Sequence, residues 1–269
     1  MPTTSQVPSP EATQTPAADA DSWPSIQTRF SVGTTTDLLE GLRFAHEHSI
    51  EMPERHWGLK LLGYAVCARL LHDPRFARLL EAGVGFGDEM YRAFDGTGGD
   101  RELWTIDNEA FYTPEQVQRG RAARANCTNV DGLLGEFCAE LPADHFDAVF
   151  SISALEHAPM ETVRAICEDT FRVTAPGGVS VHTLDFAFDT IPARIEPWLS
   201  ELQRAGFEVD EGGVDLTIGL TNAAGEAYLF EPVESVYTNW CKLRIDDGKP
   251  LPDFKTRHGA VVVVARKPG

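Results

Sequence analysis

The chain has 269 residues, of which 42% are hydrophobic, and a formal net charge of −18. A chain of this length and composition can bury one substantial core, so we expect a single α/β domain. The negative charge would repel a polyanion, and no basic stripe with interleaved aromatic residues counters it. Nucleic acid is therefore not an expected partner.

The N-terminal segment has the composition of a disordered tail. Residues 1–24 contain no Lys or Arg and are rich in Pro, Ser, Thr and Ala. They lack the basic start and apolar run of a secretory signal, and no apolar stretch in the chain approaches the roughly 20 residues of a membrane span. We expect a cytoplasmic protein with no membrane partner. The oligomeric state cannot be read from these features.

The cysteine spacing predicts neither a zinc knuckle nor a disulfide framework. The five cysteines are scattered, and no two form a Cys-x-x-Cys pair. We expect them to be reduced packing residues.

Residues 25–75 predict a helical cap that precedes the first strand of the sheet. Trp57, Leu61, Tyr64 and Ala68 fall on one helical face, and Pro74 ends the helix. Such a segment can close over a ligand or can simply cover one face of the sheet. The sequence leaves both possibilities open.

A glycine-rich turn is the most informative feature of the chain. The apolar run 77–80 predicts a strand, and it leads into Glu81-Ala82-Gly83-Val84-Gly85-Phe86-Gly87. Alternating glycines allow a sharp turn and a close approach of ligand to main chain, which is typical of a nucleotide-like ligand. The acid at position 81 favours a cationic ligand group over a pyrophosphate. The spacing also differs from the Gly-x-Gly-x-x-Gly of dinucleotide binding.

Further strands are predicted in order, and acids end two of them. The strand 102–107 ends at Asp107, 20 residues beyond Gly87, where a carboxylate can accept both hydroxyls of a ribose. The weaker strand 127–130 is followed by Asp131. A strand at 146–151 leads into Ile152-Ser153-Ala154-Leu155-Glu156-His157, and a Pro-Gly-Gly turn at 176–178 precedes a strand at 179–185.

The C-terminal third predicts alternating helices and strands followed by an insertion. Residues 160–174 have the apolar spacing of a crossover helix, and a second helix is expected near 195–205. A sixth strand is expected at 206–209 and a closing strand at 258–266. The intervening residues, about 210–257, are too many for a hairpin and predict an insertion that shapes a pocket or forms a peripheral packing surface.

Taken in order, these motifs resemble the class I S-adenosylmethionine-dependent methyltransferases, and the resemblance runs from about Ala77 to Asp185. It is carried by E-A-G-V-G-F-G, T-I-D-N, F-D-A-V-F-S-I-S-A-L-E-H and A-P-G-G-V-S-V-H. The third motif is most similar to the branch that modifies small molecules. The resemblance implies a Rossmann-like, seven-stranded, mostly parallel sheet with helices on both faces, and a methyltransferase domain over residues 76–269. The region before Asp131 departs from the family pattern because it lacks the usual Gly-Asp pair.

The resemblance also implies S-adenosylmethionine as cofactor and a role for each site residue. Gly83, Gly85 and Gly87 would face the methionine part, Glu81 its ammonium and Asp107 the ribose. The remaining residues implied by position are Asn108 and Asp131 toward the adenine, Ser151 near the amino-acid end, and Trp57, Glu156 and Asp185 toward the substrate.

Methyl transfer to a hydroxyl needs a base, and two histidines at strand ends are candidates. His157 and His182 each follow a strand at its carboxyl end, and histidine exchanges protons near neutral pH. Glu156 and His157 can instead hold the loop. His182, Asp185 and Glu156 could alternatively form an oxygen-rich magnesium site, although such residues are also common hydrogen-bonding groups, and we expect no metal.

The favoured function is methyl transfer to a small-molecule acceptor, with oxygen slightly favoured over nitrogen or carbon. A nicotinamide-dependent oxidoreductase is the second enzyme class, and the glycine spacing disfavours it. A methyltransferase-like module that binds without catalysis is the non-enzymatic alternative. The acceptor itself is not identified by any motif.

Overall fold

The structure is a computed structural model that describes residues 27–50, 52, 59–85, 87–95, 100–187, 191–210 and 258–269. The tail expected at residues 1–24, Trp57 and nearly all of the insertion expected at 210–257 lie outside the described residues. Their predicted structure and roles stay predictions.

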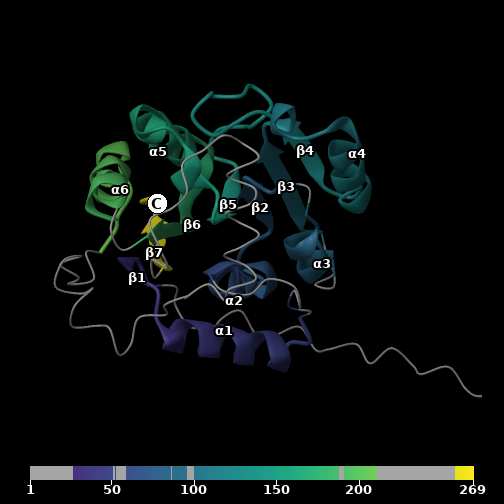
Figure 1. Ribbon diagram of the computed structural model, residues 1–269, viewed down its shortest axis with the longest axis horizontal. Coiled ribbons are helices and arrows are strands. Elements are labelled where there is room, and N and C mark those ends of the chain that lie inside the picture. The colour runs from purple at the N-terminus through teal and green to yellow at the C-terminus, as the bar shows by residue number, and fades with distance from the viewer. Residues whose placement is uncertain are drawn as a thin grey trace, which may run out of the picture.

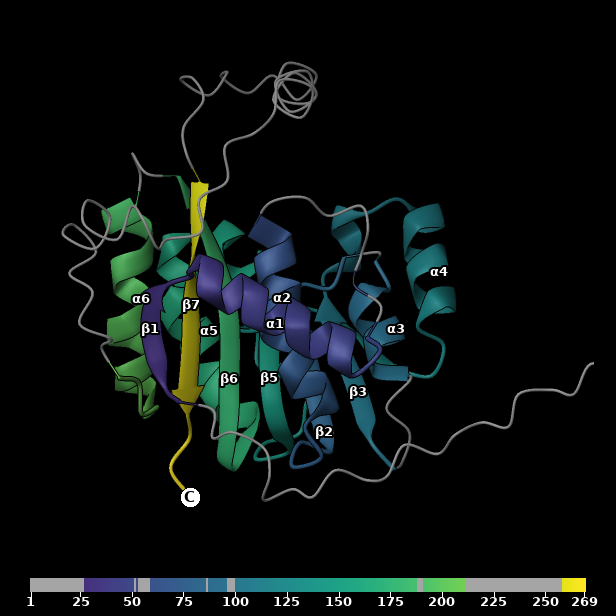
Figure 2. The ribbon, with the colours of Figure 1, turned by 90° about the horizontal axis from the view of Figure 1, so that it is seen from below.

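A seven-stranded sheet with the order β1-β7-β6-β5-β2-β3-β4 forms the centre of the fold (Figure 2). Its strands are β1 (Arg29–Val32), β2 (Arg78–Ala82), β3 (Glu102–Asp107), β4 (Thr128–Asp131), β5 (Phe146–Ile152), β6 (Thr174–Ala187) and β7 (His258–Arg266). Strands β2 to β6 run parallel to one another, and β7 runs antiparallel to both β6 and β1. The predicted fold class, a Rossmann-like and mostly parallel sheet, is confirmed.

Helices cover both faces of this sheet (Figure 1). They are α1 (Thr35–Glu47), α2 (Leu59–His72), α3 (Glu89–Asp95), α4 (Pro114–Ala123), α5 (Val163–Val173) and α6 (Ile191–Ala205), with short 3-10 turns η2 (Glu109–Phe111), η3 (Leu155–His157) and η4 (Met160–Thr162). Helix α2 packs on the central strands, with α1 outside it, whereas α5 and α6 pack together on the opposite face. None of the described helices has the length and apolar character needed to cross a membrane.

Side-chain caps define where two of these helices begin. Thr34 and Asp37 form a reciprocal capping box at α1, and Thr113 and Gln116 form another at α4, where Pro114 occupies the first turn. Both pairs satisfy backbone amides that a helix start would otherwise leave unpaired. The beginning of α4 matters for the site because this helix leads directly to the buried Arg124.

The edge of the sheet differs from the sequence prediction. Residues expected to belong to a helical cap form β1, in which Phe30 and Val32 are each 5% exposed. The sixth strand expected at 206–209 is reduced to an isolated bridge between Glu208 and Arg266. The amide of Phe30 donates to the carbonyl of Asp210 at 3.0 Å, so the two segments share the edge next to β7. In this four-residue strand every second side chain is apolar, and the pattern is too short for periodicity to distinguish a strand from part of a helical cap.

The central strands are buried on both sides, because helical layers cover both faces of the sheet. Ala260 to Ala265 of β7 are all 5% exposed or less, and Phe146 and Phe150 of β5 are fully buried. This packing fixes the sheet and brings the carboxyl ends of β2 to β6 to one edge. The loops at that edge carry the residues singled out by sequence.

Candidate functional site

The glycine loop follows β2 and has left-handed backbone where glycine is favoured. Gly83 and Gly85 have φ angles of +74° and +63°. A Cβ at Gly83 would lie 2.3 Å from the Cβ of Ala154, which follows β5, so no larger residue fits there without a shift. The loop therefore packs tightly against the β5 end while it exposes main chain to a ligand.

Asp107 connects the end of β3 to this loop. Its Oδ2 accepts a hydrogen bond from the Gly85 amide at 2.6 Å and another from the Tyr112 hydroxyl at 3.2 Å. The residue is 9% exposed, and burial raises the pKa of Asp107 above its usual range. The predicted ribose acceptor thus lies beside the glycine loop, where the resemblance places it.

Glu81 lies at the end of β2 on the face covered by α2. It is 7% exposed, and its Oε2 has no hydrogen-bonding partner in the described part of the chain. Burial raises the pKa of Glu81 to about 8, although the charge of Arg124 acts in the opposite direction. A small pocket lined by Lys60, Tyr64, Glu81 and Gly83 opens here. A buried carboxylate oxygen without a donor suits an ammonium group that a ligand brings.

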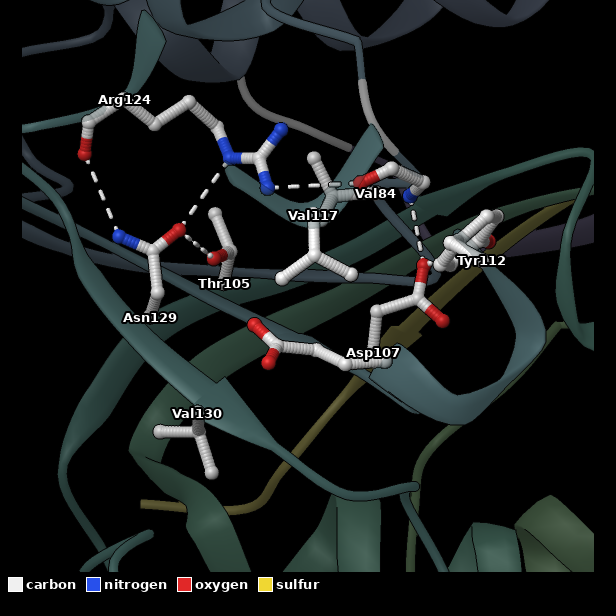
Figure 3. Close-up of a pocket in the computed structure, with 10 residues that line it drawn as sticks. Val84, Thr105, Asp107, Tyr112, Val117, Arg124, Asn129 and Val130 are labelled. Carbon is white, nitrogen blue, oxygen red and sulfur yellow. Dashed lines mark hydrogen bonds between the residues drawn. The ribbon is translucent and has the colours of Figure 1, made fainter. Parts of the chain in front are cut away.

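Arg124 is a site residue that sequence reasoning missed. It follows α4, is 5% exposed, and lies in a second pocket behind the loop (Figure 3). Its guanidinium donates to the carbonyl of Gly87 and, at 3.4 Å, to that of Gly85. Its Nε donates to Oδ1 of Asn129 at 3.3 Å (Figure 3). Arg124 therefore holds the carbonyl side of the loop whose amide side is held by Asp107.

Asn129 links Arg124 to the sheet. Its Oδ1 also accepts from Thr105 at 3.0 Å, and its Nδ2 donates to the backbone carbonyls of Arg124 and Cys127 at 3.2 and 3.0 Å. This small network joins β3, β4 and the segment after α4. A single arginine after a helix belongs to no recognisable motif, so the sequence contained no signal for the role of Arg124.

Two predicted adenine contacts lie nearby and have structural bonds. Asn108 caps η2 by accepting from the Ala110 amide at 2.9 Å. Asp131, which is exposed, accepts from the Glu109 amide at 3.0 Å. The register pairs Asp107 with Asp131, so the ends of β3 and β4 lie side by side.

The two candidate histidines differ sharply in their surroundings. His182 is 1% exposed, and its ring nitrogens are hydrogen-bonded to Ser151 at 2.9 Å and Ser180 at 2.5 Å. Burial lowers the pKa of His182 to about 3. It neighbours Thr183, which faces α2, so its ring points to the opposite side of β6. His182 is therefore placed as a buried neutral residue, and the base proposed from its strand-end position is not supported there.

His157 lies in η3 with its side chain 77% exposed, and its Nε2 is 3.8 Å from Oε1 of Glu156. Glu156 itself is 8% exposed, and it lies near the partly buried Asp185. Ser151, predicted near the amino-acid end of the cofactor, is fully buried, and its hydroxyl is the partner of His182. Among the described residues, no three His, Cys, Asp or Glu side chains lie together as metal ligands.

One family model matches the central part of the chain. Residues 79–178 match the model of a family described as a methyltransferase domain. These residues span the glycine loop, Asp107, Asp131 and η3. No curated protein matched the chain.

Solved structures resemble the chain only distantly. An S-adenosylmethionine-dependent methyltransferase from Mesorhizobium loti is 18% identical with a TM-score of 0.45, covering 75% of this chain and 96% of its own. Phosphoethanolamine N-methyltransferase 2 from Haemonchus contortus, with S-adenosylmethionine bound, is 15% identical with a TM-score of 0.39, covering 71% and 49%. The cyclase SpnF is 18% identical with a TM-score of 0.47, covering 88% and 99%. At this level of identity the likeness concerns the fold.

Proposed function

We propose that this chain is a class I S-adenosylmethionine-dependent methyltransferase that transfers the methyl group to a small-molecule acceptor, with oxygen slightly favoured over nitrogen or carbon. The observation that carries the proposal is the buried Glu81 carboxylate beside the glycine loop, with one oxygen unpaired in the described part of the chain. An oxidoreductase that binds a pyrophosphate would place a negative ligand group against this carboxylate. The net charge of −18 supports a small molecule over a nucleic acid.

The residues present fit this cofactor. Glu81 would take its ammonium, Asp107 its ribose hydroxyls, and the main chain of Gly83 to Gly85 would lie along its methionine part. When bound, S-adenosylmethionine supplies a methyl group on a sulfonium, which is already an activated leaving group. The protein then has to align an acceptor with that methyl and remove a proton where the acceptor is a hydroxyl.

Two carboxyl groups and one guanidinium surround the loop, and a cationic ligand is favoured there because it stabilises the ionised form of the carboxyl groups. Arg124 lies close enough to lower the pKa of both Glu81 and Asp107, although burial of each carboxyl acts more strongly in the other direction. A cofactor with an ammonium and a sulfonium adds the positive charge that such a site lacks. Preorganised opposite charge of this kind both holds and orients a ligand.

Incubation with methyl-tritiated S-adenosylmethionine and pooled hydroxyl, amine, thiol and carbon acceptors tests the proposal. We expect transfer of tritium to a small molecule, strongly reduced by Asp107→Ala and unchanged by Asp100→Ala, an exposed aspartate outside the site. Binding of a nicotinamide dinucleotide in place of S-adenosylmethionine would support the oxidoreductase. Cofactor binding without transfer to any acceptor class would support a non-catalytic module.

A further inference from the structure

A second pair of carboxyl groups lies at the same edge of the sheet. Glu156 follows β5 in η3, and Asp185 lies near the end of β6. We propose that Glu156 accepts the proton of a hydroxyl-bearing acceptor during methyl transfer, with Asp185 as the charge that tunes it. This inference rests on the proposed function, and it moves the base from the histidines to a carboxylate.

The carboxylate of Glu156 is buried, and within the described part of the chain no group meets the geometry of a hydrogen bond to it. Its side chain is 6% exposed, and neither oxygen has a hydrogen-bonding partner among the described residues. Nε2 of His157 is 3.8 Å from Oε1, which is beyond hydrogen-bonding distance. A buried carboxyl group without a hydrogen-bonding partner is costly to the fold, so its position at this edge points to a use with a ligand.

The polar groups around Glu156 come from β6 and the segment after β5. Ser153 donates from Oγ to Oδ1 of Asp185 at 2.9 Å, and its amide donates to the carbonyl of Thr183 at 3.0 Å. Thr183 lies two residues before Asp185 on the same face of β6, and its buried Oγ1 has no hydrogen-bonding partner in the described ranges. The edge thus presents two carboxyls and a hydroxyl to a polar ligand.

These groups lie beside the glycine loop and beneath α2. Ala154, two residues before Glu156, is the residue that a Cβ at Gly83 would meet at 2.3 Å. On the α2 side, a Cβ at Gly63 would lie 2.7 Å from Oγ1 of Thr183. Glu156 therefore lies close to both α2 and the glycine loop, and the nearby pocket that Lys60, Gly83 and Ile152 line is where an acceptor would meet the methyl donor.

Burial, together with the charge of Asp185, makes Glu156 a stronger base than an ordinary glutamate. Burial raises the pKa of Glu156, and the charge of the neighbouring Asp185 raises it further, whereas the nearby backbone amides of Glu156 and Asp185, and then Lys60 of α2, lower it. Burial also raises the pKa of Asp185, against the effects of Ser153 and Lys60. A base whose pKa lies nearer neutrality is more effective at accepting a proton near pH 7. Among the described residues, His157 of η3 is a further titratable neighbour, with Nε2 3.8 Å from Oε1 of Glu156.

A hydroxyl acceptor requires such a base more than other acceptors do, because a neutral O–H is a weak nucleophile. In the proposed step, the acceptor oxygen forms a bond to the methyl carbon while the carbon–sulfur bond breaks and its electron pair stays on sulfur. The proton of the hydroxyl moves to the carboxylate of Glu156. The products are a methyl ether, S-adenosylhomocysteine and protonated Glu156, which returns its proton to water.

Steady-state methyl transfer to phenol, catechol and benzyl alcohol tests the proposal, with aniline and thiophenol as the amine and thiol counterparts. The variants are Glu156→Gln, Asp185→Asn and Lys60→Met, and Glu140→Gln serves as an exposed control. Calorimetry with S-adenosylmethionine and circular dichroism accompany each assay. If the unmodified protein does not bind S-adenosylmethionine, the proposed function is overturned, and the role of Glu156 that rests on it is overturned as well.

We expect hydroxyl probes to be methylated, and Glu156→Gln to lower kcat by about 10² or more with unchanged cofactor affinity. The rate of the unmodified protein should rise with pH as Glu156 ionises. Asp185→Asn should shift that rise to lower pH, and Lys60→Met to higher pH, because they remove charges of opposite sign. The proposal is overturned if S-adenosylmethionine binds but no hydroxyl probe is methylated, or if Glu156→Gln keeps the kcat of the unmodified protein. It is also overturned if neither Asp185→Asn nor Lys60→Met shifts the pH dependence of the rate.

Discussion

The carboxylate of Asp107 accepts a hydrogen bond from the backbone amide of Gly85 at 2.6 Å, which ties the end of β3 to the loop after β2. The same oxygen accepts from the hydroxyl of Tyr112 at 3.2 Å. One side chain thus shapes the glycine loop and also lies where the ribose is expected. Changes at Asp107 should affect loop geometry and ligand contact together.

Asp107→Ala should weaken S-adenosylmethionine binding about tenfold or more, because a charge-assisted hydrogen bond is worth about 1.5 to 3 kcal/mol. Isothermal titration calorimetry measures the change. Asp100→Ala, at an exposed position, should bind like the unmodified protein. Unchanged affinity in a folded Asp107→Ala variant would remove the assigned role.

The strands were predictable where apolar runs are continuous and an acid or a glycine ends them. Strand β3 has the bounds expected from sequence, 102–107, and β5 extends the expected 146–151 by one residue. Strand β1 was not predicted, because only two of its four residues are buried, and so short a pattern does not distinguish the periodicity of a strand from that of a helix. The position of β1 at the sheet edge depends on pairing with β7, more than 200 residues away in the sequence.

Side-chain roles were less predictable than strands. His182 was correctly expected on a strand, but β6 is buried on both faces, so hydropathy does not tell which way its ring points. Arg124 acts through backbone carbonyls 37 and 39 residues away, which no local pattern encodes. The glycine loop was predictable because its requirement is local backbone geometry.

Arg124→Met should destabilise the protein by about 2 to 4 kcal/mol and weaken cofactor binding, because carbonyls of the loop lose their donor and two buried carboxylates lose a neighbouring cation. Urea denaturation and calorimetry report the two effects. Arg43→Met is the matched control, since Arg43 is exposed on α1. Equal stability of both variants would show that Arg124 does not support the loop.

Gly83→Ala should cost more stability than Gly177→Ala, although the two glycines have similar backbone. Their φ angles are +74° and +77°, so both alanines carry a left-handed strain of about 1 to 2 kcal/mol. Only at Gly83 does the new Cβ meet another group, Ala154, whereas nothing lies within 4 Å of a Cβ at Gly177. Thermal unfolding should therefore give a lower melting temperature for Gly83→Ala than for Gly177→Ala, and only Gly83→Ala should lose cofactor affinity.

Glu81→Gln should raise stability at alkaline pH. The pKa of Glu81 rises from 4.5 to about 8 on folding, because the folded protein favours the protonated carboxyl. The contribution of this proton to the free energy of unfolding is complete below about pH 4.5 and is lost as the pH rises through 8. Glutamine does not ionise, and its advantage should therefore grow from pH 5 to pH 9, by roughly 1 to 3 kcal/mol. Free energies of unfolding measured across that range, beside Glu140→Gln, test the sign. A constant difference would mean that Glu81 is already ionised at pH 5.

Binding of S-adenosylmethionine near pH 7 should release a proton from Glu81. The free protein holds that proton because burial raises the pKa of the carboxyl to about 8, and an ammonium beside Oε2 would favour the ionised form. Calorimetry in buffers of different ionisation enthalpy measures the proton directly. The release should disappear in Glu81→Gln, together with part of the affinity, and persist in Glu156→Gln. Release that persists in Glu81→Gln would place the titrating group elsewhere and leave the ammonium without its assigned partner.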